Sequence, residues 1–349
     1  MPARRVFFVS PLTDAIAYRG VLATRSDIDF RELTAATPAK EAVAVLESAH
    51  AYQVGSVRDE LPPPYRVNDA LFARAPNMLL VSTHGAGYDS VDVEACTRAG
   101  VLAVNQAGGN AEAVAEHVMA MMLCLTKRII ETDRFMRRQD NIPRVSYMGR
   151  NVLGKTIGVI GIGHVGTRVA ALCRGLFQMR ILAYDPLLTA AEIAQRGAES
   201  VDLDTLLRQS DYVSVNCPFT AQSRGLIGAR EYALMQKHAY FINTARGGIH
   251  DEPDLIDALR EKKIAGAGLD VWDLEPPPAS HPLMQFDNVL VSPHTAGVTF
   301  ESRKNIATIA AQQLLDVLDG KRPPRLLNPE VWPDYAKRFE RILGFAPTP

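Results

Sequence analysis

The stretch Thr156-Ile-Gly-Val-Ile-Gly161-Ile-Gly163-His-Val-Gly166 decides the fold of this 349-residue chain. Residues 156–160 form an apolar run typical of a buried strand, and a helix with an apolar stripe is expected to follow the glycines. Gly161 permits a tight turn, Gly163 lets a ligand approach the backbone, and Gly166 lets the helix pack on the strand. Strand, glycines and helix in this order predict a pyrophosphate site at the helix N-terminus.

An acidic residue follows where a dinucleotide site needs one. A second expected strand, 180–184, runs into Asp185, which stands about 20 residues after the last glycine. A carboxylate there accepts hydrogen bonds from the adenosine ribose and repels a 2′-phosphate. The sequence therefore predicts NAD as the cofactor. The residues expected to bind it here are Gly161, Gly163, His164, Val165, Gly166 and Asp185.

Strands and helices alternate on both sides of this stretch. Upstream, apolar runs at 6–10, 51–57 and 78–83 alternate with helical segments. Downstream, strands are expected at 180–184, 212–215, 239–243, 266–270 and 289–292. An amphipathic helix at about 300–319 is expected to return to the first lobe. This alternation predicts an α/β protein with parallel sheets, and the length predicts two domains.

The bulk composition disfavours several classes of partner. The 38 basic and 39 acidic residues leave a net charge of −1, and no block of like charges marks a nucleic-acid or membrane surface. The longest apolar stretch, 118–125, is far shorter than the roughly 20 residues that cross a bilayer. We expect a cytoplasmic protein. The four cysteines are widely spaced, and no pattern predicts a disulfide framework or a metal site.

Chemically active side chains follow the expected downstream strands. In open α/β sheets, ligands bind at the carboxyl ends of the strands. Arg246 offers a planar fork suited to a carboxylate, although a surface ion pair is the usual role of an arginine. His294 stands in a proline- and glycine-bounded loop that can aim it at a ligand. The segments concerned are Cys217-Pro218, Asn243–Gly248, Leu269–Pro276 and Ser292–Gly297.

These motifs resemble, in order, those of the D-isomer-specific 2-hydroxyacid dehydrogenase family. The resemblance covers about residues 78–328 and includes upstream matches at Ser82–Asp92 and Asn110–His117. It implies that Arg246 binds substrate, that His294 donates or accepts a proton, and that Glu275 orients and charges His294. It also extends the expected cofactor-binding set to Cys217, Pro218, Thr244, Ala245, Arg246, Asp270, His294 and Gly297.

The resemblance assigns the substrate's carboxylate to a loop of the first lobe. Backbone N–H groups of Ala86 and Gly87 would hold it, because glycines let the chain approach an anion closely. With Arg246 and His294 they form the expected substrate-binding set. Taken alone, the Gly-Ala-Gly segment favours a simple tight turn, and the downstream motifs reverse that preference. His117 is expected to be a packing or hinge residue.

The resemblance implies a particular architecture and activity. We expect a Rossmann-type doubly wound parallel sheet domain, 108–298, inserted in a flavodoxin-like α/β domain formed by 1–107 and 299–349, with the active site between them. The expected reaction is NAD-dependent interconversion of a small 2-keto acid and the D-2-hydroxy acid. Hydroxypyruvate and glyoxylate are the favoured substrates. A homodimer is implied by the resemblance alone.

Two alternatives stay open. A formate dehydrogenase of the same family has a similar site but a glutamine where Glu275 stands, so Glu275 argues against it. An NAD(H)-sensing corepressor shares the fold and the catalytic trio but works by binding partners. Turnover of a keto acid distinguishes an enzyme from such a sensor. Because the chain ends at residue 349, we expect no regulatory domain after the returning helix.

Overall fold

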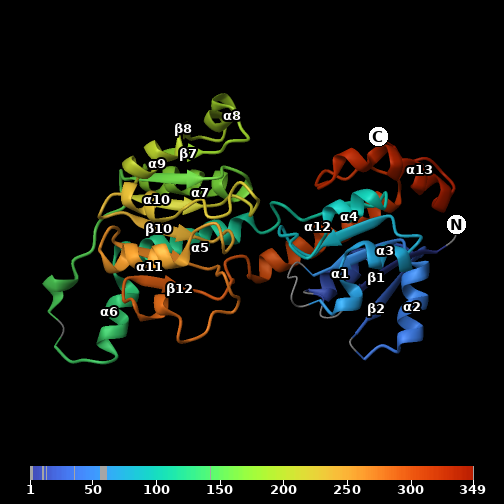
Figure 1. Ribbon diagram of the computed structural model, residues 1–349, viewed down its shortest axis with the longest axis horizontal. Coiled ribbons are helices and arrows are strands. Elements are labelled where there is room, and N and C mark those ends of the chain that lie inside the picture. Colours follow the sequence, from blue (N-terminus) through green and yellow to red (C-terminus); the bar gives the residue numbers. More distant parts are fainter. Residues whose placement is uncertain are drawn as a thin grey trace. The chain divides into compact units, whose positions relative to one another are not determined.

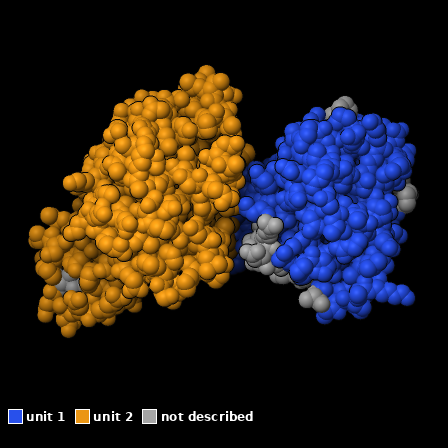
Figure 2. All heavy atoms as spheres, viewed as in Figure 1, with its two compact units in different colours: residues 1–110, 299–349 blue, residues 111–298 orange. Residues whose placement is uncertain are grey.

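The computed structural model describes residues 3–9, 12, 14–34, 36–55, 61–141 and 143–348 (Figure 1). The chain divides into two compact units: unit 1 comprises 1–110 and 299–349, and unit 2 comprises 111–298 (Figure 2). Parallel strands and helices build each unit, which confirms the α/β fold class. The ends of two expected strands, at Ser10 and at 56–57, lie outside the described residues.

The described residues of unit 2 form a seven-stranded parallel sheet in the order β12-β11-β10-β9-β6-β7-β8. From β6 the chain winds outward through β7 and β8, then returns to the other side of β6 and continues from β9 to β12. This is the Rossmann-type order, whose switch point between β6 and β9 is where such sheets bind ligands. The strands are β6 (Thr156–Ile160), β7 (Arg180–Tyr184), β8 (Glu199–Ser200), β9 (Tyr212–Val215), β10 (Tyr240–Asn243), β11 (Gly266–Leu269) and β12 (Val289–Val291).

Helices cover both faces of this sheet (Figure 1). Val118 and Val169, on α5 and α7, belong to one apolar core, and Leu206 and Leu255, on α9 and α11, belong to another. Helix α8 begins at a capping box, in which Thr189 and Glu192 bond each other's backbone N–H groups. The helices are α5 (Ala111–Thr126), α6 (Ile129–Met136), α7 (His164–Phe177), α8 (Ala190–Gln195), α9 (Leu203–Gln209), α10 (Ala229–Leu234) and α11 (Glu252–Arg260).

In unit 1 the described residues form a five-stranded parallel sheet in the flavodoxin-like order β2-β1-β3-β4-β5. The predicted return of the last long helix is confirmed, because α12 packs on α1 and β4. The strands are β1 (Arg4–Val9), β2 (Ile28–Leu33), β3 (Ala51–Val54), β4 (Leu80–Thr83) and β5 (Leu102–Val104). The helices are α1 (Ala15–Leu22), α2 (Ala39–Ser48), α3 (Asp69–Arg74), α4 (Val93–Arg98), α12 (Phe300–Leu318) and α13 (Trp332–Leu343).

Several elements of unit 1 were not predicted from the sequence. Strand β2 lies at the edge of the sheet and mixes charged with apolar residues, so it lacks the apolar run of a buried strand. Helix α13 follows a proline-rich segment, yet it buries Tyr335 and Phe339 in the core of unit 1. Its stripe of large apolar residues was the signal that could have revealed it.

The described part of the chain shows neither a metal cluster nor a candidate membrane span. Within it, no group of three or more histidine, cysteine or acidic side chains is placed to hold a metal ion. No helix in the described ranges has both the length and the apolar character needed to cross a bilayer. Cys96, Cys124, Cys173 and Cys217 are free thiols.

His250 is a buried neutral histidine in unit 2. It follows β10, is 1% exposed and accepts a hydrogen bond at Nδ1 from the Asn243 side-chain amide, 3.0 Å away. An Nδ1 acceptor places the proton on Nε2, which has no partner among the described residues. Burial lowers the pKa of His250 to about 4, against a weaker opposing effect of Asp251. The folded protein therefore resists protonation of this ring.

This burial predicts a loss of stability in mild acid. Below about pH 6.5 the unfolded chain binds a proton at His250, whereas the folded chain does so only near pH 4, so stability falls between these values. His250 should contribute about 2 kcal/mol of this loss by about pH 5. Between about pH 7 and pH 5, the unfolding free energy of His250→Gln, measured in urea, should therefore fall by about 2 kcal/mol less than that of the parent.

The control is His238→Gln, because His238 is partly exposed and hydrogen-bonds Asp211 at 2.9 Å. This variant should keep the acid sensitivity that the parent owes to His250. Equal pH dependence of the unfolding free energy in the parent and in His250→Gln would contradict the prediction.

Candidate active site

The glycines after β6 have distinct geometric roles. Gly161 has φ of +84°, and a Cβ added there would lie 2.7 Å from the Cα of Cys217. A Cβ on Gly166 would lie 2.2 Å from the carbonyl oxygen of Gly161. A Cβ on Gly163 would meet no atom within 4 Å, so the backbone is open where α7 begins at His164. The loop thus has the shape that the sequence predicts for phosphate approach at a helix N-terminus.

Asp185 lies beside this loop. Its carboxylate accepts the N–H of Ile162 at 3.0 Å and the N–H of Leu187 at 3.1 Å. Ile162 stands between the first two glycines, so the acid at the end of β7 is fixed next to the turn after β6. This places a negative charge at the edge of the loop, as expected for a ribose acceptor.

Two polar atoms without partners lie where the next two strands end. Thr244 follows β10 and Asn216 follows β9, and these strands pair with Asn243 opposite Val215. Among the described residues, the buried hydroxyl of Thr244 and the buried side-chain amide oxygen of Asn216 have no hydrogen-bond partner. Buried polar atoms are normally satisfied. These two therefore suit the hydrogen-bonding ribose and nicotinamide of NAD, and the residues present fit that cofactor.

His294 and Glu275 are in direct contact. The Nδ1 of His294 lies 2.6 Å from an oxygen of Glu275, and each side chain is about one-third exposed. The second oxygen of Glu275 accepts the N–H of Trp272 at 3.1 Å. The contact that the sequence predicts across 19 positions is therefore present. With Nδ1 engaged, Nε2 is the ring nitrogen that can exchange a proton with a ligand.

The surroundings of Glu275 favour its charged form. Burial by itself would raise the pKa of this carboxyl. The hydrogen bond and charge of His294 oppose that effect most strongly. The N–H of Trp272 and the charge of Arg246 add to them, and the pKa of Glu275 ends below its ordinary value. A carboxylate is therefore held against the imidazole at neutral pH.

Asp270 holds the loop that carries His294. Its fully buried carboxylate accepts the N–H groups of Thr295 and Ala296, both at 2.8 Å, and the hydroxyl of Ser292 at 2.6 Å. Its carbonyl oxygen accepts the N–H of His294 at 2.7 Å. His294 itself has φ of +56°, a conformation that L-residues rarely adopt. Asp270, which is expected to contact the cofactor, therefore also positions the loop that carries His294.

A histidine from α5 joins this network. The Ser292 hydroxyl donates to the carboxylate of Asp270, so it can only accept from Nε2 of His117, 3.0 Å away. The sequence predicts a packing or hinge role for His117, and the structure adds this hydrogen bond. The Trp272 indole also bonds the carbonyl of Ser292, at 3.0 Å. The sequence alone predicts no role for Ser292 or Trp272, although both stand in the segments that follow β11 and β12.

Arg246 is held in a turn organised by Asn243. The Asn243 amide accepts the N–H of Ala245 and donates to the carbonyl of Arg246, both at 2.9 Å. One guanidinium nitrogen of Arg246 donates to the carbonyl of Ala245 at 2.7 Å. The charge of Arg246 is one of the effects that favour the ionised form of Glu275. Arg246 therefore lies at the same edge of the sheet as Glu275 and His294. The structure therefore gathers the three predicted catalytic residues in unit 2.

The loop with Ala86 and Gly87 belongs to unit 1 and follows β4. The side chain of Asn105 donates to the carbonyl of Ala86, and the N–H of Gln106 donates to that of Gly85, both at 2.8 Å. Within the described residues, the N–H groups of Ala86 and Gly87 donate to no oxygen. Both residues are partly exposed. This loop therefore presents two N–H groups that can receive an anion.

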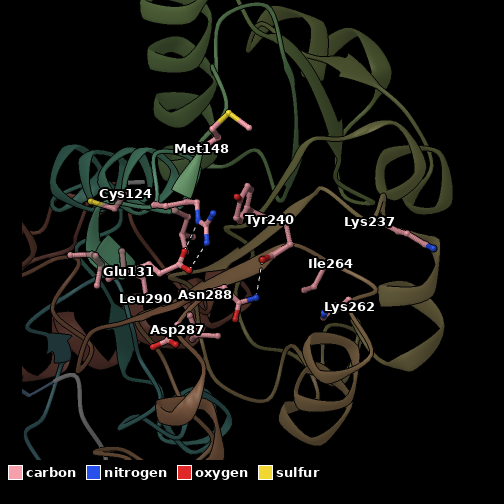
Figure 3. A pocket seen from close by; sticks show the side chains of 15 residues that line it. Cys124, Glu131, Met148, Lys237, Tyr240, Lys262, Ile264, Asp287, Asn288 and Leu290 are labelled. Carbon is pink, nitrogen blue, oxygen red and sulfur yellow. Dashed lines mark hydrogen bonds and ion pairs between the residues drawn. The ribbon is translucent and has the colours of Figure 1, made fainter. Parts of the chain in front are cut away.

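A cavity of about 410 Å³ lies elsewhere on unit 2, at the amino ends of β10, β11 and β12 (Figure 3). Tyr240, at the start of β10, and Met148 line it, together with an ion pair between Arg128 and Glu131 at 2.6 Å. Arg246, Glu275 and His294 follow the carboxyl ends of the same strands. This cavity is thus separate from the candidate active site.

Comparison with known proteins identifies the family. Residues 119–296 match the model described as D-isomer specific 2-hydroxyacid dehydrogenase, NAD binding domain. The chain is 40% identical over 270 residues to a glyoxylate reductase of Thermofilum pendens, covering 76% of this chain and 79% of that protein. It is 38% identical over 281 residues to a D-3-phosphoglycerate dehydrogenase of Archaeoglobus fulgidus, covering 80% of this chain. It spans about half the length of that relative, 52%.

Solved structures agree. A glyoxylate reductase from Paecilomyes thermophila superposes with a TM-score of 0.81 at 25% identity, covering 95% of this chain and 99% of that one. A D-lactate dehydrogenase from Aquifex aeolicus, solved with NAD and lactic acid, superposes with a TM-score of 0.73 at 28% identity, covering 90% and 96%. The glycine loop, the acid after β7 and the gathered Arg246, Glu275 and His294 fit this relationship. The chain therefore belongs to the D-isomer-specific 2-hydroxyacid dehydrogenase family, with an NAD-binding domain in unit 2.

Proposed function

We propose that the protein interconverts a small 2-keto acid and the corresponding D-2-hydroxy acid, with NAD as hydride carrier. The observation that carries this proposal is the contact of His294 with Glu275 at 2.6 Å, beside Arg246 at the cofactor edge of the sheet. It unites a proton donor, its counter-ion and a cation for an anionic substrate. The names of the glyoxylate reductase relatives support glyoxylate as a substrate. Hydroxypyruvate is the second candidate of this proposal.

Each residue has a defined task in the proposed reduction. When bound, NADH supplies the hydride. Arg246 binds the carboxylate and carbonyl side of the keto acid, and its fork fixes the orientation of the substrate. The Nε2 of protonated His294 donates a proton to the forming alkoxide, while Glu275 stabilises the imidazolium. Ala86 and Gly87 stay predicted donors to the substrate carboxylate.

A substrate panel tests this function. NADH oxidation with hydroxypyruvate, glyoxylate and phenylpyruvate should be saturable for at least one of them, with hydroxypyruvate or glyoxylate preferred. For hydroxypyruvate and phenylpyruvate, whose reduced products are chiral, the product should be the D-2-hydroxy acid. Binding of NADH without turnover of any keto or hydroxy acid would contradict an enzyme and favour the NAD(H)-sensing alternative. The cytoplasmic location stays a prediction.

The Glu275 contact predicts a particular pH dependence. Reduction requires His294 to carry a proton, whereas oxidation requires it to be neutral. Glu275, whose own pKa lies below its usual value, is charged at neutral pH and favours the protonated imidazole. Glu275→Gln keeps the shape and removes this charge. The pH at which reduction is lost and the pH at which oxidation begins should both fall, because a neutral amide no longer stabilises the imidazolium.

This is measured as kcat/KM against pH in both directions, where a deuterium isotope effect shows that hydride transfer limits the rate. Glu261→Gln is the matched control, because Glu261 is an exposed glutamate paired with Lys263 away from the proposed site. Its profile should match that of the parent. Unmoved profiles for Glu275→Gln in both directions would assign Glu275 a purely structural role.

We also propose that the protein is a homodimer that associates through the segment 129–153 of unit 2. This segment contains several large apolar side chains that are exposed in the single chain. Met136, Val145 and Met148 are each about three-quarters exposed, and Ile129 and Leu153 are about half or more exposed. Such a concentration of apolar side chains on one segment is typical of an association surface.

Light scattering tests this assembly. The parent should have twice the mass of one chain, and Met136→Lys combined with Met148→Lys should shift it toward the monomer, because burying lysines in an apolar interface is costly. The control, Leu176→Lys, changes an exposed leucine on α7 outside the segment and should leave the dimer intact. A monomeric parent would exclude the dimer, and a dimer unaffected by the double substitution would exclude this segment.

A further inference from the structure

Arg196 stands next to the dinucleotide loop although it is distant in sequence. It directly follows α8, and its Nη1 donates to the carbonyl of Ile162 at 2.7 Å. The N–H of the same Ile162 donates to Asp185 at 3.0 Å. The backbone of Ile162 is therefore held on both sides. Its N–H donates to the carboxylate of Asp185, and its carbonyl accepts from the guanidinium of Arg196. The sequence shows no arginine at 186–188, and the fold supplies one from 196 instead.

The guanidinium of Arg196 has donors to spare. An arginine side chain carries five N–H donors in a planar fork. Among the described residues, the bond to Ile162 is the only side-chain hydrogen bond that Arg196 makes. The carboxylate of Glu192 feels the charge of Arg196 but forms no ion pair with it in the described structure. The residue is partly exposed, so a ligand can reach it. Because the bond to Ile162 already orders the side chain, little further entropy is lost when a ligand binds.

A 2′-phosphate on the adenosine ribose distinguishes NADP from NAD. The phosphate needs a cation, which an arginine fork supplies well, and it is repelled by a carboxylate at the ribose. Asp185 is that carboxylate, and Arg196 is a cation fixed to the same loop residue. The neighbouring Arg174 on α7 lies near Gly197 but makes no bond to the glycine loop in the described structure.

We propose that Arg196 is a latent 2′-phosphate ligand, so that Asp185 alone makes the site selective for NAD. Removing the charge of Asp185 then yields a site that accepts NADP by means of Arg196, without any added arginine. This role of Arg196 rests on the proposed function, because it concerns the same dinucleotide site. Arg196 is thus the residue that would bind the 2′-phosphate once the charge of Asp185 is removed, and no motif spacing reveals it.

Equilibrium binding tests this without relying on turnover. The probes are 5′-AMP and 2′,5′-ADP, measured by calorimetry, and NADH and NADPH, measured by fluorescence. The proteins are the parent, Asp185→Ser, Arg196→Gln and the double variant. Asp185→Ser should raise the affinity for 2′,5′-ADP relative to 5′-AMP about tenfold or more. Adding Arg196→Gln should remove most of that gain.

Two further variants test whether the gain requires the guanidinium of Arg196 itself. In the Asp185→Ser background, Arg196→Lys keeps the charge without the fork and should retain only part of the gain. Arg174→Gln in that background removes a neighbouring cation and should retain all of it. Equal preference for 2′,5′-ADP in Asp185→Ser and in the double variant would overturn the role of Arg196.

The same measurements distinguish a failure of the latent phosphate site from a failure of the proposed function. If the parent binds 5′-AMP and NADH but the gain is independent of Arg196, only the latent phosphate site is wrong. If Asp185→Ser shows no gain at all, Asp185 is not the sole barrier and the proposal fails. Failure of the parent to bind either 5′-AMP or NADH would overturn the dinucleotide site and this inference with it.

Discussion

The buried carboxylate of Asp270 is the constraint on which the candidate active site depends. A carboxylate without solvent must be fully hydrogen-bonded, and this one is satisfied by two backbone N–H groups and by Ser292. Both N–H groups come from the residues just after His294. The carboxylate therefore fixes the loop in which His294 takes a left-handed conformation and reaches Glu275. An apolar side chain at 270 could not organise this loop.

The parallel sheet explains why distant residues meet. All strands of unit 2 point the same way, so the segments after β9, β10, β11 and β12 gather at one edge. The glycine loop after β6 opens at that edge, beside the switch point of strand order. The proposed cofactor-binding residues and the proposed proton-transfer residues thus share one edge because of topology. Among the described residues, no histidine lines the cavity at the opposite ends of β10 to β12.

Much of this architecture was predictable from the sequence, because it depends on local signals and motif order. The strand with its glycines and Asp185 identified the nucleotide fold, and the family resemblance paired Glu275 with His294. The bonds of His117 to Ser292 and of Arg196 to Ile162 join residues 175 and 34 positions apart and leave no periodic signal. Edge strand β2 was missed because a partly exposed strand need not have an apolar run.

In the proposed reduction, His294 donates the proton while hydride passes to the keto carbon. The most direct measurement is single-turnover reduction of glyoxylate or hydroxypyruvate with NADH deuterated at C4, on each face in turn. We predict that deuterium from one face appears at C2 of the product, and that His294→Gln slows this transfer about 10²-fold or more while NADH still binds. Transfer at the parent rate in His294→Gln, or no deuterium at C2 from either face, would contradict this mechanism.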